Sequence, residues 1–462
     1  MPQSSHSDSP WTELATLLGD RLSRDAATCQ AHAGDASHHR AEPPPAVAFP
    51  RDQEEVVQLV RLCARHRLPL IPYGTGTAVE GGIVAQGGGL CVDTSNLNRI
   101  IAVEAGDMDA TVEAGVTRHQ LNDYLADHHP GLHFPIDPGA DASLGGMAST
   151  RASGTAAVRY GTMRDNVLGL TAVLGDGRLI HTGGRARKSS AGYDLTALLV
   201  GSEGTLGLIT QLTLRLAPLP EAVSAAVCPF ASVAKAVDAA IEIIGAGIPV
   251  ARLEMLDAVE MDAVVRYADL PYAVAPTLFF EFHGSDKAVV EQAEKAGQIA
   301  RQYGGANFHW ATEENQRRRL WQARHDGYHA CMALRPGSVA YITDVCVPIS
   351  QLATCIEATR RDLDASELIA PLFGHVGDGN FHVVFPLDPN APNELEEAKR
   401  LGDRMVERAL EAGGTCTGEH GIGLGKLDAL EREAGEGIET MRAIKAALDP
   451  NNIMNPGKVL RG

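Results

Sequence analysis

Apolar residues recur at helical spacing between Arg51 and Arg67, and this spacing predicts an amphipathic helix. Asp52, followed three residues later by Glu55, forms a capping signature at the start of the helix. The apolar run 68–72 comes directly afterwards and predicts a buried strand. This strand runs straight into a glycine- and threonine-rich segment, which is a first candidate binding loop.

Further along the chain, short strand patterns, glycine-rich segments and helical patterns follow one another. Strand patterns separated by turns occupy residues 90–116 and 169–181. Helical spacing returns at 233–245 and 286–303, where nothing points to chemistry. Pro218-Leu219-Pro220 lies between these two halves and indicates a domain boundary.

The segment Phe373–Phe385 predicts a hairpin, because apolar residues flank a Gly-Asp-Gly-Asn core. Asp378 and Gly379 suit the two central positions of a type I′ turn. With that turn His375 faces His382, and directly opposed residues have Cβ atoms about 4.5–5.5 Å apart. Two imidazoles at that distance can share one metal ion, whereas the alternative is a hairpin with two half-exposed histidines.

A third metal ligand is available in the glycine-rich segment 413–426, which contains Glu419 and His420. Glu419 with the two histidines gives a ligand set suited to Zn²⁺ or Mn²⁺ and leaves a position open for a substrate oxygen. His420 is then free to act as a general base. The alternative is a polar corner in a glycine-rich loop.

The segment Tyr73–Gly82 suits a backbone that wraps around phosphates through N–H groups and hydroxyls. It is not a Rossmann fingerprint, because Val79 stands where the last glycine is needed. It is not a Walker A loop either, and the later segment 421–426 also fails that pattern because Leu427 follows the lysine. A glycine-rich hairpin loop without a ligand is the alternative.

Length and composition limit the class of protein. A chain of 462 residues suggests two or three domains, and 44% apolar with 21% charged residues is ordinary for a globular protein. The net charge of −18 argues against nucleic acid or an anionic membrane surface as a broad partner. An anionic substrate would therefore need a local cationic clamp.

The eight cysteines lack Cys-x-x-Cys pairs, so free thiols in a reducing compartment are expected. No apolar run approaches the ~18 residues that a spanning helix needs, and no signal-peptide pattern stands at the start. We therefore expect a cytoplasmic location, with peripheral contact at the inner face of the membrane left open.

Several separated motifs resemble the FAD-linked oxidase family of the vanillyl-alcohol-oxidase superfamily. More narrowly, residues 152–164 and 343–348 resemble the cytochrome-type D-lactate dehydrogenases. The similarity extends from about residue 43 to the C-terminus. The motifs that carry it are Pro72–Gly82, Pro135–Ser149, Ala191–Thr210, Phe373–His382, Gly418–Lys426 and Asn455-Pro456-Gly457-Lys458.

This resemblance implies an α/β (α+β) protein with an N-terminal extension over 1–42 and a PCMH-type FAD-binding domain of two α/β subdomains over 43–220. A mixed α/β cap domain for substrate and metal follows over 221–450, and the segment 451–462 returns to the FAD domain. Some relatives bond the flavin to a histidine in the first glycine loop. No histidine stands between Tyr73 and Gly89, so non-covalent FAD is expected.

The cofactor contacts that the resemblance implies are carried over by position. Gly74 to Thr77 would hold the pyrophosphate, and Asn455 would lie near the isoalloxazine. The full expected set is Tyr73, Gly74, Thr75, Gly76, Thr77, Gly82, Pro138, Gly139, Ala142, Ser143, Gly146, Ser149, Gly154, Glu203, Gly204, Ile209 and Asn455.

Arg324 resembles the arginine of the family's Trp-x-x-Arg motif, which binds the substrate carboxylate, and a guanidinium suits that task. A surface salt bridge is the alternative. Relatives that act on 2-hydroxyglutarate carry a lysine at the position of Ile342 and an asparagine at that of Val384. Both departures favour a monocarboxylate with a small side chain.

The expected reaction is the oxidation of D-lactate to pyruvate, with the substrate carboxylate on Arg324 and its hydroxyl on an ion held by His375, His382 and Glu419. His420 takes the proton while hydride passes to flavin N5. A cytochrome c or quinone-type acceptor is expected to take the electrons.

Three alternatives stay open. The same fold can act on glycolate or other D-2-hydroxy acids, including D-2-hydroxyglutarate, or hand electrons to oxygen as an oxidase. In the third, the chain is a structural FAD- and metal-binding subunit of a respiratory complex. Whether the chain forms a homodimer is also left open.

Overall fold

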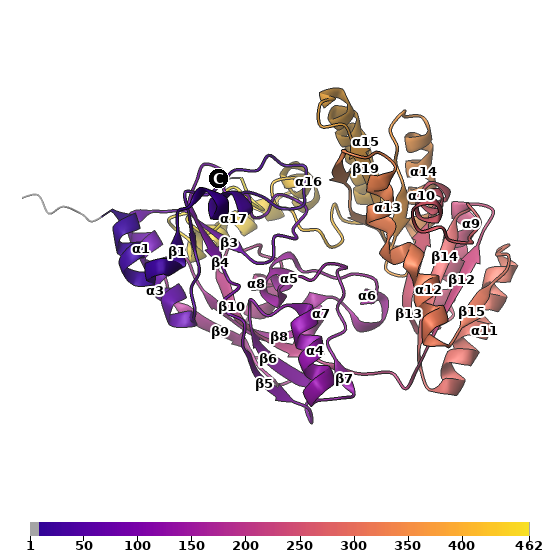
Figure 1. Ribbon diagram of the computed structural model, residues 1–462, viewed down its shortest axis with the longest axis horizontal. Helices are drawn as coiled ribbons and strands as arrows, with labels where there is room; N and C mark the ends of the chain where they lie inside the picture. The colour runs from indigo at the N-terminus through magenta and orange to yellow at the C-terminus, as the bar shows by residue number, and fades with distance from the viewer. Residues whose placement is uncertain (1–8, 462) are drawn as a thin grey trace, which may run out of the picture.

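The computed structural model describes residues 9–461, which form two lobes joined side by side (Figure 1). Helices and strands are mixed in both lobes, and the predicted mixed α/β class is confirmed. Among the described residues, no helix is both long enough and apolar enough to cross a membrane.

The first sheet of the N-terminal lobe has four strands in the order β1-β2-β4-β3. Strands β2, β4 and β3 run parallel, and β1 is an antiparallel edge. The strand bounds are β1 Leu22–Ser23, β2 Ala46–Ala48, β3 Leu70–Tyr73 and β4 Leu90–Asp93.

The predicted helix between 51 and 67 is confirmed as α3, Gln53–His66, whose cap Asp52 accepts a hydrogen bond from the Glu55 amide. Its apolar face packs against α1, Pro10–Leu18, and both bury leucines in one core cluster with the sheet. The helices η1 (Gly19–Arg21) and α2 (Ala26–Ala31) complete this part.

The second sheet of the same lobe is antiparallel, in the order β5-β6-β10-β8-β9. Helix α5 begins after the glycine- and serine-rich loop, with Ser143 as its N-cap. The strand bounds are β5 Ile100–Glu104, β6 Asp109–Glu113, β8 Val167–Val173, β9 Leu179–Gly183 and β10 Leu208–Arg215. The helices are α4 Arg118–His128, α5 Leu144–Thr150, α6 Ala157–Tyr160, α7 Met163–Asn166 and α8 Leu195–Leu199. A separate ribbon pairs β7 Leu132–His133 with β11 Ala217–Pro218.

The second lobe is built on one antiparallel sheet in the order β15-β12-β14-β13-β18-β19-β16, with β17 also paired to β19. Its strand bounds are β12 Ala222–Pro229, β13 Val250–Leu256, β14 Thr277–Gly284, β15 His309–Ala311, β16 Val339–Ile342, β17 Val345–Cys346, β18 Leu372–Gly374 and β19 Asn380–Leu387.

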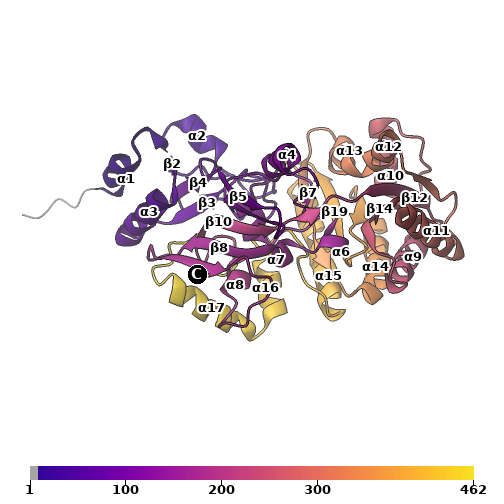
Figure 2. The ribbon, with the colours of Figure 1, turned by 90° about the horizontal axis from the view of Figure 1, so that it is seen from below.

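Helices cover both faces of this sheet (Figure 2). Alternate residues of a strand point to opposite faces, and β14 accordingly sends Phe280 into one core cluster and Phe279 into another. One face carries α9 Val233–Gly245, α11 Asp286–Gln302, α14 Leu352–Asp364 and α15 Pro392–Glu411, with η2 Ile349–Gln351 before α14. The other carries α10 Ala258–Ala268, α12 Glu314–His325 and α13 Gly327–Ala333.

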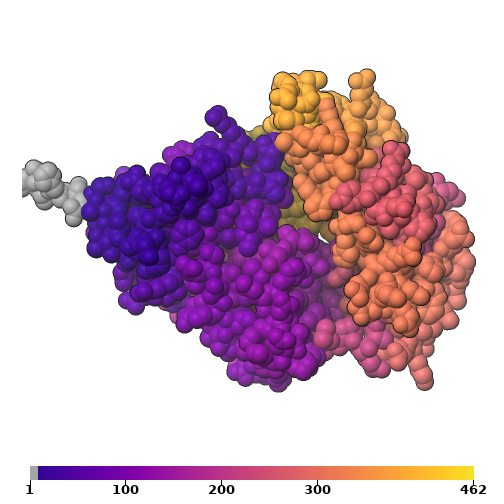
Figure 3. Space-filling view, in the orientation of Figure 1, coloured from indigo at the N-terminus to yellow at the C-terminus, as the bar shows by residue number. Residues whose placement is uncertain are grey.

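The end of the chain runs back to the N-terminal lobe through α16, Leu427–Ala434, and α17, Gly437–Leu448. Met454 forms a parallel bridge with Leu70 of β3. The chain therefore ties both lobes together near the glycine-rich loop that follows β3. In the space-filling view, the molecule is hollowed between the two lobes (Figure 3).

Candidate active site

A cavity lies where glycine-rich loops of the N-terminal lobe meet residues from the second half of the chain. It encloses about 1300 Å³ of space, part of it open to solvent. Its walls include the loop 72–83, residues 138–153 and residues 203–209. Glu419 and His420 also line it, so the expected cofactor loops and the expected base share one cavity.

Nearly all expected cofactor residues lie in the cavity wall. They are Tyr73, Gly74, Thr75, Gly76, Thr77, Gly82, Pro138, Ala142, Ser143, Gly146, Ser149, Glu203, Gly204, Ile209 and Asn455. Gly139 and Gly154 are the exceptions, and both lie against Asp137, the residue before the lining residue Pro138. The Gly139 amide donates to Asp137 Oδ1, and a Cβ on Gly154 would stand 1.8 Å from the Asp137 carbonyl oxygen.

The loops are packed so closely that side chains are excluded at two points of contact. A Cβ on Gly74 would lie 2.4 Å from Ser143 Oγ, and one on Gly204 would lie 2.5 Å from Pro72 Cγ. Asn455 Nδ2 donates to the Gly82 and Glu203 carbonyls, while its buried Oδ1 has no hydrogen-bond partner among residues 9–461. A buried acceptor without a donor needs a partner, so these residues fit a polar ligand such as FAD.

The three expected metal ligands come together. His375 Nε2 lies 3.0 Å and His382 Nε2 lies 3.3 Å from the same oxygen, Oε1 of Glu419. Ligand atoms of the three residues all lie within 4.8 Å of one another, and both histidines are buried. Two imidazoles and a carboxylate in this arrangement fit a divalent cation with a position left for another ligand.

The predicted hairpin register is wrong. Phe373, not His375, is paired with His382, and residues 375–379 form a longer turn. Of the two expected turn residues, only Gly379 has positive φ. The turn is wider because the Gly377 amide donates to the Leu253 carbonyl of neighbouring β13, which draws the backbone away from β19. The imidazoles of His375 and His382 nevertheless approach, with ring centroids 5.4 Å apart.

Glu254 of β13 orients His375 from behind. Its carboxylate lies 2.7 Å from His375 Nδ1, which leaves Nε2 directed at Glu419. Burial lowers the pKa of His375, but the Glu254 and Glu419 carboxylates outweigh it and raise that pKa to about 10. A carboxylate behind a histidine is the usual support of a metal ligand, and this environment favours a cation at Nε2.

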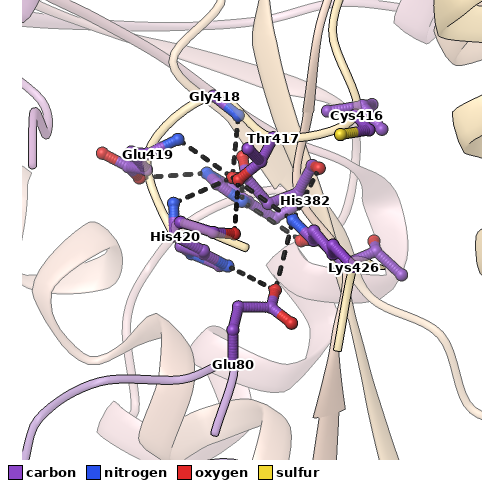
Figure 4. A network of polar contacts seen from close by, with 12 residues as sticks. Glu80, His382, Cys416, Thr417, Gly418, Glu419, His420 and Lys426 are labelled. Carbon is purple, nitrogen blue, oxygen red and sulfur yellow. Dashed lines mark hydrogen bonds and ion pairs between the residues drawn. The ribbon is translucent and has the colours of Figure 1, made fainter. Parts of the chain in front are cut away.

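Asp344 organises the loop that carries Glu419 and His420. Its Oδ2 accepts hydrogen bonds from the amides of three consecutive residues, Gly418, Glu419 and His420, at 2.8–3.0 Å. The same oxygen accepts from Thr417 Oγ1. Figure 4 labels the loop residues from Cys416 to His420. Burial raises the pKa of Asp344, but nearby Lys426, with His420 and His382, outweighs this effect and holds that pKa well below its usual range.

His420 lines the cavity next to this cluster, and its ring stacks on His382 at a centroid distance of 5.0 Å. Burial lowers the pKa of His420 to about 4, against the opposing influence of Asp344. The imidazole is therefore neutral at neutral pH, which is the state that a general base requires.

Arg324 of α12 is buried beside the same cluster rather than exposed at a surface. Its Nε donates to Glu254 Oε2 at 2.7 Å. In the described part of the chain, neither terminal nitrogen makes a hydrogen bond to protein. The two terminal nitrogens of Arg324 are therefore available to donate to a ligand, while Glu254 holds the Nε nitrogen.

Sequence reasoning missed Glu254 and did not assign a role to Asp344 or Ser153, whose Oγ donates to Glu419 Oε2 at 2.7 Å. An acidic residue inside the apolar strand Val250–Leu256 was an available signal, since fully buried acids are rare unless paired. His283, by contrast, contacts Tyr160 and Glu281 and lies outside this cluster.

Comparison with known proteins identifies the family. Residues 44–183 match the model described as "FAD binding domain", and residues 219–459 match "FAD linked oxidases, C-terminal domain". A relative from Danio rerio, "Probable D-lactate dehydrogenase, mitochondrial", is 53% identical over 97% of this chain and 91% of its own. "D-lactate dehydrogenase [cytochrome], mitochondrial" from Arabidopsis thaliana is 46% identical over 97% of this chain and 79% of its own.

A more distant relative is "Glycolate oxidase subunit GlcD" from Bacillus subtilis, 35% identical over 92% of this chain and 91% of its own. Among solved structures, p-cresol methylhydroxylase with substrate bound has a TM-score of 0.79 over 97% of this chain and 96% of that chain. At 19% identity this likeness establishes the fold, which is the expected PCMH-type FAD oxidase fold. The chain belongs to the FAD-linked oxidases, a family of FAD-binding oxidoreductases.

Proposed function

We propose that this protein is an FAD-dependent D-2-hydroxy acid dehydrogenase that oxidises D-lactate to pyruvate. The observation that carries the proposal is the convergence of His375 and His382 on Glu419, which lines the cavity that the glycine-rich loops form. The names of the relatives at 53% and 46% identity support D-lactate as substrate.

We assign each polar group one task. The free terminal nitrogens of Arg324 bind the substrate carboxylate bidentately. His420 removes the proton of the substrate hydroxyl, because its neutral imidazole lines the cavity. Glu254 holds both Arg324 and His375, so it sets the spacing between the carboxylate site and the metal ligands.

Two bound groups complete the proposed site. FAD would be held non-covalently by the cavity wall, and a Zn²⁺ or Mn²⁺ ion by His375, His382 and Glu419. When bound, FAD supplies a hydride acceptor and the ion supplies a Lewis acid for the substrate hydroxyl.

An apolar pair supports a small monocarboxylate. Ile342 of β16 and Val384 of β19 are direct partners in the sheet. Val384 is two residues from His382 and therefore lies on the same face of β19. Neither side chain can neutralise a second carboxylate, so a dicarboxylate would bury an unpaired charge.

A substrate preference follows from this apolar pair. In anaerobic mixing with the FAD-loaded protein, we expect D-lactate to bleach the flavin absorbance rapidly and L-lactate not to bleach it. We expect D-2-hydroxyglutarate to have a kcat/KM at least about 10²-fold lower than D-lactate, since it leaves a buried charge unpaired. Removal of the divalent ion by a chelator should abolish bleaching by D-lactate, and its return should restore it. Bleaching by L-lactate alone, or by no hydroxy acid, would contradict the proposed function.

Glycolate is the second candidate substrate, because a relative named as a glycolate oxidase subunit is 35% identical. The same panel separates the two, since a glycolate enzyme should have the higher kcat/KM with glycolate.

We propose a cytochrome or quinone-type acceptor, supported by the word "cytochrome" in the name of the Arabidopsis thaliana relative. A stoichiometric yield of hydrogen peroxide would point to an oxidase instead. A cytoplasmic location, peripheral membrane contact and a homodimer stay predictions.

A further inference from the structure

Glu80 belongs to the first glycine-rich loop, yet its carboxylate points at the loop that carries His420. Its Oε1 lies 3.8 Å from His420 Nδ1 (Figure 4). Both atoms are buried, and neither has an aligned hydrogen-bond partner among residues 9–461. Buried polar atoms without a hydrogen bond are costly, so a hydrogen bond between these two atoms would stabilise both.

The backbone fixes Glu80 against this loop. Its carbonyl oxygen accepts hydrogen bonds from the Leu424 and Gly425 amides at 2.8 and 3.2 Å. A Cβ on Gly423 would stand 2.1 Å from the same oxygen, so the contact requires glycine there. The distance between Glu80 and His420 is thus set by loop packing and not by a flexible surface side chain.

Lys426 shares the Glu80 carboxylate. Its Nζ lies 3.1 Å from Oε1, and it also donates to the Asp344 carbonyl. A carboxylate oxygen can accept from two donors, so the ion pair with Lys426 leaves room for His420. Burial raises the pKa of Glu80 to about 7, and the ion pair with Lys426 acts against that rise by favouring the ionised carboxylate.

The two nitrogens of His420 have different surroundings. Nδ1 is buried beside Glu80 and has no hydrogen-bond partner among residues 9–461. The ring lines the cavity, and Nε2 is not one of the buried atoms that lack a partner. A neutral imidazole carries one proton, and the hydrogen bond made by one nitrogen decides which nitrogen is free. The stack on His382 further restricts rotation of the ring.

We propose that Glu80 is a positioning residue for the base: it accepts a hydrogen bond from Nδ1–H of His420 and thereby leaves Nε2 as the proton acceptor toward the cavity. This inference rests on the proposed function of His420. When the substrate hydroxyl gives its proton to Nε2, the Nδ1–H bond to Glu80 persists. Glu80 then carries the charge opposite to the imidazolium, and no other group gains or loses a proton.

The first test reads the tautomer directly and needs no substrate. The FAD-loaded protein, reconstituted with Zn²⁺ and labelled with nitrogen-15 histidine, is examined by NMR, and a His420→Gln variant identifies the His420 signals. We expect the proton on Nδ1 and an unprotonated Nε2 in the wild type. A proton on Nε2 in the wild type would overturn the proposal, even if hydroxy-acid oxidation is observed.

The second test separates positioning from folding. For Glu80→Gln we expect kcat with D-lactate to fall about 10²-fold while KM stays within about threefold, as for a disturbed general base. The matched control is Glu55→Gln, which removes another buried, ion-paired glutamate of the same lobe, bonded to Arg21. The control should keep its kcat, and both variants should keep their FAD.

An unchanged kcat in Glu80→Gln, or an effect on KM alone, would overturn the role of Glu80. If the wild type oxidises no hydroxy acid at all, the proposed function fails, and the tautomer measurement still decides whether Glu80 orients His420.

Discussion

Replacing Glu419 with glutamine is expected to remove the divalent ion and to lower kcat by about 10³-fold. Glu419 Oε1 is the atom on which both histidine nitrogens converge, at 3.0 and 3.3 Å. An amide lacks the negative charge that a cation needs there. A Lewis acid supplies several kcal/mol of charge stabilisation, and about 4 kcal/mol corresponds to about 10³-fold in rate. Metal content per FAD, by elemental analysis, and kcat with D-lactate measure the effect.

FAD content is expected to be unchanged in Glu419→Gln, because most of the cavity wall comes from the N-terminal lobe. The matched control is Glu433→Gln on the neighbouring helix α16. Exposed Glu433 accepts hydrogen bonds from Thr415 and Cys416 of the same loop and is not one of the three proposed metal ligands. The control should keep its metal. Full metal occupancy in Glu419→Gln would show that the ion, if bound, lies elsewhere.

Asp344→Ala is expected to destabilise the second lobe by about 3–5 kcal/mol, since it leaves buried Lys426 with less counter-charge and several amides without an acceptor. Asp344 is 1% exposed, and its two oxygens bind both Asn380 of the hairpin and the loop of His420. Loss of these hydrogen bonds should also weaken metal affinity at least about 10- to 100-fold, as for other groups that hydrogen-bond to the surroundings of metal ligands. Denaturant unfolding and metal titration give the two values.

The matched control for this variant is Asp257→Ala. Asp257 is equally buried and binds Arg360 and the start of α10. It should lose comparable stability but keep its metal affinity, because it does not contact the loop. If both variants lose metal to the same extent, Asp344 has only a general structural role. If Asp344→Ala does not fold, Thr417→Val removes one hydrogen bond to Asp344 and should lower stability by about 1 kcal/mol. This variant tests the same set of hydrogen bonds.

Local sequence patterns predicted the elements whose signal lies within a short stretch of the chain. Helix α3 and strand β3 were predicted from apolar spacing and the Asp52 cap, and the glycine-rich loop after β3, predicted to bind a ligand, lines the cavity. The resemblance to a known family supplied most of the cavity wall. In these cases the signal lies within a short stretch of chain, so no tertiary contact was needed to read it.

What failed depended on partners distant in sequence. The hairpin register was wrong because Leu253 of another strand binds the turn, which no local pattern reveals. Glu254 was missed because its partner His375 is 121 residues away along the chain. The three expected metal ligands lie together despite the wrong register, since the wider turn still brings both imidazoles to the same carboxylate.

The most direct measurement is anomalous X-ray diffraction from crystals of the FAD-loaded protein, collected at the zinc and manganese absorption edges. The account predicts one peak about 2.0–2.2 Å from His375 Nε2, His382 Nε2 and a Glu419 oxygen. No peak at these three side chains in metal-supplemented crystals, or a peak only at other residues, would contradict it.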